Sequence, residues 1–238
     1  MNTGFYNNWP YLNKSLSIKL SQIHNDFKLQ IMIANKVAIK KASEIIKKGG
    51  IIIYPTDTVY GLGCNPFDEE AVKKLIKIKG ERNKPLPILA SSVEDVEKIA
   101  LLTPLSKKLI ELFWPGALTI VLKKKPVLPS IVTFGLDSVG VRIPKNPFTI
   151  ELIKDCGGLL IGTSANISGA TSCRSVDEVL KQLNQKLNLI DLIIDGGETE
   201  IGVGSTVIDL TNDEVKVLRE GPISENEIIS VIKRVISY

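Results

Sequence analysis

Hydrophobic positions alternate between a helical and a strand period from residue 35 onward. In residues 35–48 the apolar side chains share one helical face, lysines fill the other, and Gly49-Gly50 predicts the end of the helix. Residues 51–54 are continuously apolar, as in a buried strand, and Pro55 ends that run. Further strands are predicted at residues 86–90, 117–122, 139–143, 159–161, 192–195, 206–210 and 215–219.

Capping residues and prolines mark the starts of the intervening helices. A capping side chain accepts from a free backbone N–H group, and proline has no N–H group to satisfy. Asp68 precedes a helix through Lys79, with acidic residues in its first turn and lysines later, as the helix dipole favours. The other predicted helix starts are two capping boxes at residues 91–94 and 175–178, Thr103 with Pro104, Asn146 with Pro147, and Ser224 with Glu227.

Strands and helices interleave along the chain, while three late strands follow one another over short turns. This order predicts one α/β domain with a mixed sheet flanked by helices over residues 33–238. Residues 1–32 show no clear period, so we expect an irregular N-terminal extension there. No internal repeat or low-complexity linker interrupts the domain.

Composition is that of a globular protein, with 44% hydrophobic and 24% charged residues. No apolar run approaches the ~18 residues of a membrane span, and the N-terminus lacks the basic and apolar regions of a secretory signal. The cysteines, Cys64, Cys156 and Cys173, are widely spaced and odd in number. We therefore expect neither a disulfide scaffold nor a zinc cluster, and a cytoplasmic protein with no membrane partner.

A net charge of +4 and a pI near 8.8 make the chain mildly basic. That charge suits an anionic ligand such as a nucleotide and is compatible with a contact to RNA, although it demonstrates neither. The aromatic content of 5% argues against a platform that stacks single-stranded bases.

Several common catalytic and nucleotide-binding motifs are absent from the sequence. His24 is the single histidine and lies in the predicted extension, which argues against a Ser-His-Asp or Cys-His mechanism. Neither an HExxH motif nor a CxxC pair offers a zinc site. The glycines around Ser205 lack P-loop spacing, and no GxGxxG motif follows a strand.

Six loops carry the remaining candidate chemistry: residues 54–63, 77–87, 142–144, 161–169, 202–209 and 218–222. They combine hydroxyl residues and glycines with isolated Arg or Lys residues near predicted strand or helix ends. Each loop alone is also explained as an ordinary turn, since turns favour these residue types. Together they offer the guanidinium forks, hydroxyls and backbone N–H groups that bind polyphosphates and carboxylates.

Seven signatures, six of them overlapping these loops, resemble the YrdC-like family and occur in the same order. They are PTDTVYGLG, KPLP, FWPGALTIVL, VGVRIP, TSANISG, GSTVID and LREG, and the resemblance covers about residues 33–235. It implies a twisted open mixed sheet with a concave basic face. Because the family includes threonylcarbamoyl-AMP synthases, it also implies a catalytic domain that joins L-threonine, bicarbonate or CO₂ and ATP, with release of pyrophosphate. The product feeds threonylcarbamoyladenosine (t6A) formation at position 37 of tRNA.

The same resemblance implies roles for individual residues. The implied catalytic residues are Lys79, Arg82, Ser164 and Asn166. The implied ATP-binding residues are Lys79, Arg82, Lys84, Thr119, Ser164, Asn166, Ser205 and Arg219. The implied threonine-binding residues are Thr56, Tyr60, Arg142 and Ser205. Mg²⁺ is expected to be held through the phosphates and water rather than by protein side chains.

Some alternatives stay open at this point. The spacing from Lys79 to Lys84 is shorter than in the family, so the pairing of cations with phosphates is undecided. Asp57 suits a turn better than a general base, and Thr119 suits core packing as well as a ligand contact. A non-catalytic binder of double-stranded RNA or tRNA is the main alternative function.

A related group of carbamoyltransferases embeds such a domain in a larger zinc-bearing protein. The lack of CxxC motifs argues against that group, and because the chain ends at Tyr238 we expect the single-domain form. In either case, we expect the product to pass to the tRNA threonylcarbamoyl-transfer machinery.

Overall fold

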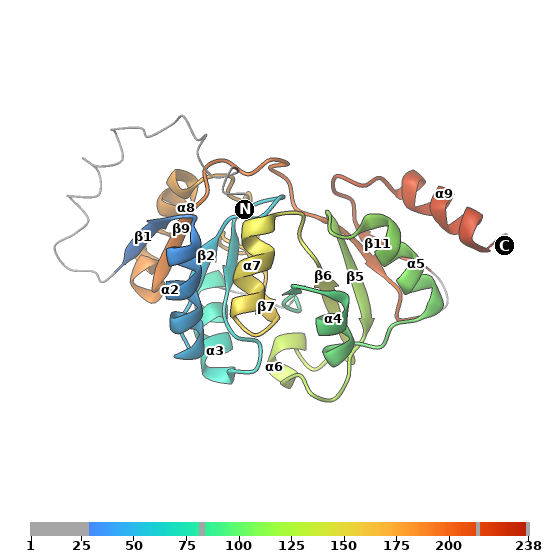
Figure 1. Ribbon diagram of the computed structural model, residues 1–238, viewed down its shortest axis with the longest axis horizontal. Coiled ribbons are helices and arrows are strands. Elements are labelled where there is room, and N and C mark those ends of the chain that lie inside the picture. The colour runs from blue at the N-terminus through green and yellow to red at the C-terminus, as the bar shows by residue number, and fades with distance from the viewer. Residues whose placement is uncertain (1–28, 81–83, 213–214, 237–238) are drawn as a thin grey trace, which may run out of the picture.

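The computed structural model describes residues 29–80, 84–212 and 215–236, and its strands form two mixed sheets (Figure 1). An α/β fold with helices around mixed sheets was predicted and is confirmed. The prediction of a single sheet is wrong in detail, because the hydrophobic pattern reveals strands but not which strands pair. Among the described residues, no helix has the length and apolar character needed to cross a membrane.

The first sheet has the strand order β1-β9-β2-β3-β8. Its strands are β1 (Gln30–Ile33), β2 (Ile52–Tyr54), β3 (Gly61–Gly63), β8 (Thr163–Ser164) and β9 (Leu192–Asp195). β9 runs parallel to β1 and β2, whereas β3 is antiparallel to β2 and β8. Residues 30–32, expected in the irregular extension, belong to β1 instead. The pairing of β1 with β9, distant in sequence, orders a stretch that has no clear period of its own.

The second sheet has the strand order β11-β10-β5-β6-β4-β7. Its strands are β4 (Ile88–Ala90), β5 (Leu118–Lys123), β6 (Ser138–Arg142), β7 (Leu159–Ile161), β10 (Thr206–Asp209) and β11 (Lys216–Arg219). β10 pairs with β5 in parallel and with β11 antiparallel. The two sheets meet where the backbone N–H of Ile161 donates to the carbonyl of Cys64, at 3.0 Å. All seven strand regions predicted after residue 85 are strands in the structure.

Side-chain caps define most helix starts. The helices are α2 (Lys36–Lys47), α3 (Glu69–Lys79), α4 (Val93–Ile99), α5 (Pro104–Phe113), α6 (Ser130–Thr133), α7 (Pro147–Asp155), α8 (Val176–Leu183), the 3₁₀ helix η1 (Asn184–Leu189) and α9 (Glu225–Ile236). Asp68 caps α3 and Ser175 caps α8, as expected. The N-cap of α4 is Ser92, one residue later than the Ser91 expected, and its side chain accepts the N–H of Asp95.

The central strands β2 and β9 of the first sheet are buried on both faces. Ile52 and Ile194 face a small apolar cluster that includes residues of α2 and α7, which cover this side of the sheet. Ile53 and Ile193 face the opposite way, into a larger cluster shared with the second sheet. Burial on both faces explains the unbroken apolar runs of β2 and β9, since neither face required polar residues. The polar groups of the site therefore lie in the loops that leave these strands.

Candidate functional site

The loop at residues 55–60 is a compact buried turn organised by Thr56. Its Oγ1 accepts from the backbone N–H groups of Thr58 (3.1 Å) and Val59 (3.2 Å) and donates to the Val59 carbonyl (2.6 Å). These side-chain hydrogen bonds satisfy backbone groups that have no strand or helix partner in the loop. The hydroxyl of Thr56, expected to line a threonine pocket, is thus engaged in the turn.

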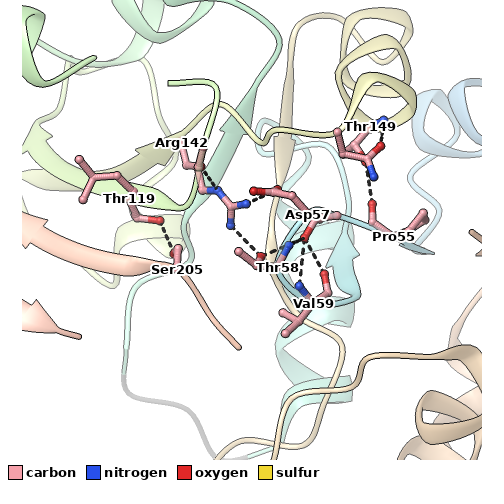
Figure 2. A network of polar contacts seen from close by, with 12 residues as sticks. Pro55, Asp57, Thr58, Val59, Thr119, Arg142, Thr149 and Ser205 are labelled. Carbon is pink, nitrogen blue, oxygen red and sulfur yellow. Dashed lines mark hydrogen bonds and ion pairs between the residues drawn. The ribbon is translucent and has the colours of Figure 1, made fainter. Parts of the chain in front are cut away.

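Arg142, at the end of β6, is held from three sides (Figure 2). Its Nε donates to the Gly116 carbonyl (2.8 Å), Nη1 donates to Thr58 Oγ1 (2.9 Å), and Nη2 pairs with Asp57 Oδ1. Burial lowers the pKa of Arg142, and the charge of Asp57 opposes that shift. One N–H on each terminal nitrogen makes no bond to a described residue and is available to a carboxylate.

The sequence favoured Asp57 as a turn-capping residue. In the structure, Asp57 pairs with Arg142 instead. Its side chain is only 2% exposed, and its Oδ2 has no hydrogen-bond partner among the described residues. The turn itself is closed by Thr56, its neighbour. The sequence signal for this pairing was weak, because the two residues are 85 positions apart.

Tyr60 links the 55–60 loop to residues 196–205, which we call the crossing segment because it runs from β9 in the first sheet to β10 in the second. The buried hydroxyl of Tyr60 donates to the Gly197 carbonyl (2.7 Å) and accepts from the Gly196 N–H (3.1 Å). The Ile201 N–H also donates to the Asp57 carbonyl (3.0 Å). Tyr60 therefore shapes the path of the crossing segment.

Thr119, Ser205 and Arg219 meet where β5, β10 and β11 lie side by side. Thr119 Oγ1 lies 2.7 Å from Ser205 Oγ, and Arg219 Nη2 donates to the Ser205 carbonyl (2.6 Å). Arg219 is exposed and makes no ion pair with a described residue, although partial burial lowers the pKa of its guanidinium. In Figure 2, Thr119 and Ser205 lie on the side of Arg142 away from Asp57. Besides burial, the charge of Arg219 also lowers the pKa of Arg142, so these two cations interact across this part of the site.

Lys79 joins the end of α3 to the loop that follows β8. Its Nζ donates to the carbonyls of Ser164 (2.7 Å) and Asn166 (2.6 Å) and to Asn166 Oδ1 (2.7 Å). Its own carbonyl accepts from the Ser168 N–H (3.0 Å), and Ser164 Oγ donates to Asn166 Oδ1 (2.5 Å). Because Lys79 is 1% exposed, it shapes this loop from beneath.

The 55–60 loop and its continuation into β3 contact Arg142, the loop of Ser164 and Asn166, and the crossing segment. Gly61, next to Tyr60, pairs with Ser164, and the Ala165 N–H donates to the Tyr60 carbonyl (2.8 Å). Asp57 binds Arg142, and the crossing segment ends at Ser205. These contacts link most of the predicted residues into one region. Lys84 is exposed, and Arg82 lies outside the described residues.

Of the four buried polar atoms that lack a partner in the described part of the chain, three lie in the same loops. Among the described residues these atoms are Asp57 Oδ2, Ser168 Oγ, Gln182 Oε1 and Thr199 Oγ1. Asp57 lies in the 55–60 loop, Ser168 follows Asn166, and Thr199 lies in the crossing segment. Such atoms are uncommon in folded proteins and accompany functional sites or bound water. No cluster of metal-ligating side chains occurs in the described part of the chain.

A surface hollow of about 550 Å³ lies apart from these residues. Its lining includes Ser91 before α4, Asp95 and Lys98 within α4, and Lys154 and Gly158. The Asp95 carboxylate already accepts from Ser91 Oγ (2.5 Å) and Lys98 Nζ (2.7 Å). This hollow therefore reflects the docking of α4 and holds none of the predicted site residues.

All three thiols are held in their neutral form. Burial raises the pKa of Cys64 and of Cys156 to about 12, and that of Cys173 to about 11. At pH 8, about one Cys173 in a thousand is therefore a thiolate. We expect the native protein to react with Ellman's reagent much more slowly than the urea-unfolded protein, in which all three react. One thiol that reacts in the native protein as fast as in urea would contradict this.

The comparisons with known proteins come from sequence and from structure. The Sua5/YciO/YrdC family model, described as "Telomere recombination", matches residues 44–221. A Pyrococcus abyssi protein named threonylcarbamoyl-AMP synthase is 43% identical over 82% of this chain, which spans 57% of that relative's length. A Methanocaldococcus jannaschii relative is 42% identical, with 82% of this chain and 93% of the relative covered.

A crystal structure of P. abyssi Sua5 complexed with L-threonine superposes with a TM-score of 0.80. It is 41% identical in sequence, and the match covers 86% of this chain and 60% of that one. These similarities confirm the resemblance drawn from the loop signatures. The chain belongs to the Sua5/YciO/YrdC family.

Proposed function

We propose that this chain is a threonylcarbamoyl-AMP synthase, a nucleotidyltransferase that forms threonylcarbamoyl-adenylate and pyrophosphate from L-threonine, bicarbonate or CO₂, and ATP. The observation that carries the proposal is the placement of Arg219. This cation is exposed, held over Ser205, and without an ion pair among the described residues. An exposed guanidinium with no carboxylate partner, beside a hydroxyl and a second cation, suits a phosphate-bearing substrate. The family relatives named for this activity support the same reading.

For the amino acid, Arg142 is the proposed ligand of the threonine carboxylate. The N–H groups that its three partners leave free suit a carboxylate, and Ser205 is proposed to add a hydroxyl. Thr56 and Tyr60 are proposed to form the pocket wall, with their hydroxyls committed to the backbone.

For the nucleotide, Arg219, Thr119 and Ser205 are the proposed ligands on one side, and Ser164 with Asn166 on the other. Lys79 is proposed to shape the loop of Ser164 and Asn166, with its charge directed at the same loop. The remaining cations of the predicted triphosphate site, Arg82 and Lys84, stay proposals. Mg²⁺, when bound through the phosphates, would supply charge neutralisation at the leaving pyrophosphate.

The proposed chemistry has two steps. The threonine amine forms a bond to the carbon of CO₂ and loses a proton, which gives a carbamate. A carbamate oxygen then bonds to the α-phosphorus as the bond to the β-phosphate bridging oxygen breaks, and pyrophosphate departs. An in-line displacement needs placement and charge neutralisation more than a covalent nucleophile. The neutral, buried thiols of the chain accord with that requirement.

Pyrophosphate release tests the proposal directly. With ATP and Mg²⁺ present, we expect release to require both threonine and bicarbonate, and to fall to background when either is omitted. The wild-type protein with serine in place of threonine is the matched control for substrate specificity. ATP consumption at an equal rate without threonine would overturn the assignment.

We propose the tRNA threonylcarbamoyl-transfer machinery as the downstream acceptor, with the product used for t6A formation at position 37. The alternative of a non-catalytic RNA binder differs in its salt dependence. An electrostatic RNA contact weakens steeply as salt rises and ignores ATP. Binding of ATP that tolerates salt and strengthens with threonine would favour the enzyme.

A further inference from the structure

Asp57 and Arg142 form the most deeply buried ion pair among the described residues. Their side chains are 2% and 5% exposed, whereas every other ion pair in the described ranges has at least one side chain more than a third exposed. Exposed pairs of that kind contribute little to stability. When an ion pair is buried, the loss of hydration offsets much of the attraction between its charges. A contribution to stability therefore does not by itself explain why the pair is there.

The pair fixes the plane of the guanidinium. Arg142 ends β6, and its three partners come from two other segments. Gly116 lies just after α5, whereas Thr58 and Asp57 belong to the 55–60 loop. Three acceptors in three directions leave the guanidinium no free rotation, because any turn breaks at least one bond in a buried environment. Figure 2 shows Asp57 and Thr58 on one side of the Arg142 guanidinium, with Ser205 on the other side.

Among the described residues, Arg142 is the hydrogen-bond partner of the Asp57 carboxylate. Oδ1 faces Arg142, while Oδ2 is buried with no partner among the described residues. The backbone carbonyl of Asp57 accepts from Ile201 (3.0 Å), in the crossing segment that leads to Ser205. The same residue therefore orients Arg142 through its side chain and anchors the segment carrying Ser205 through its backbone.

We propose that Asp57 is a positioning residue that aligns Arg142 to receive the carboxylate of the amino acid substrate, without touching that substrate itself. This inference rests on the proposed function, since it assigns the amino acid carboxylate to Arg142. The proposed role of Asp57 does not involve the nucleotide side of the site, where Arg219 and Thr119 contact Ser205. Loss of the Asp57 charge should thus weaken amino acid binding selectively.

The test is Asp57→Asn, which keeps the shape of the side chain and removes its charge. By titration calorimetry, we expect the Kd for threonine to rise at least about tenfold, while the Kd for ATP stays within about twofold. The matched control is Asp191→Asn, which alters a carboxylate bonded to Ile51 N–H and Lys74 away from the site. Its threonine Kd should equal that of the wild type.

Thr58→Val provides a second variant in case Asp57→Asn fails to fold. It removes the hydroxyl that accepts from Nη1 and leaves the ion pair intact, so a smaller, threonine-specific loss of affinity is expected. In a folded variant, unchanged threonine affinity, or equal losses for threonine and ATP, would overturn the positioning role alone. Failure of the wild-type protein to bind threonine would overturn the proposed function as well.

Discussion

Lys79→Met should lower kcat/KM for ATP by at least about a hundredfold and reduce the free energy of unfolding by about 3 kcal/mol. The substitution keeps a long side chain but removes the charged donor to three oxygen acceptors on Ser164 and Asn166. Asn166 Oδ1 and the Ser164 carbonyl each keep one further donor, whereas the Asn166 carbonyl loses the donor that Lys79 supplied. Buried acceptors that lose a charged donor cost more than the bond itself was worth. The loop of Ser164 and Asn166 then loses the cation that shapes it.

Urea unfolding and steady-state pyrophosphate release would measure the two effects. The matched control is Lys77→Met on the same helix, where the side chain is exposed and a change within about 0.5 kcal/mol is expected. A stable, fully active Lys79→Met protein would show that Lys79 neither supports the loop nor assists the reaction. Loss of activity with unchanged stability would instead favour a direct phosphate contact.

Gly221→Ala should displace Arg219 and Ser205 together and abolish most ATP binding. A Cβ atom at this position would lie 2.5 Å from the Gly204 carbonyl oxygen, 2.6 Å from the Thr206 nitrogen and 2.7 Å from the Ser205 carbonyl carbon. These are backbone atoms, so the clash is relieved only if β10 and the chain after β11 move apart. The bonds from Arg219 to the Ser205 carbonyl, now 2.6 and 3.0 Å, cannot survive that movement.

We expect the Kd for ATP to rise more than about thirtyfold, with a stability loss of about 2–3 kcal/mol typical of overpacking. Gly140→Ala is the matched control in β6, where a Cβ atom would meet Thr119 Cγ2 at an ordinary 3.4 Å. Calorimetric ATP titrations of both variants would decide the matter. Equal ATP affinity in wild type and Gly221→Ala would contradict a nucleotide site built on Ser205 and Arg219.

Local features were the most predictable part of the fold. Asp68 and Ser175 cap helices as their positions suggested, and the apolar runs around Ile53 and Ile193 are buried strands. Capping and hydrophobic period act over a few residues, so the sequence displays them directly. The missed elements, such as β1 and the two-residue β8, depend on partners remote in sequence.

The candidate site was predictable as a set of loops, and less so as a set of contacts. The polar loop residues signalled that Arg142, Ser205 and Asn166 belong together. Their partners did not follow from that signal. Arg142 binds Asp57 over 85 positions, and Lys79 reaches Asn166 over 87.

The sequence by itself determined the α/β class, the helix caps and the loops that carry polar chemistry, because period and capping are local properties. Tertiary structure alone decided the division into two sheets, the burial of Lys79 and the pairing of Asp57 with Arg142. Those features depend on which strands pair and on which charges lose their water, and both follow only once the chain has closed on itself.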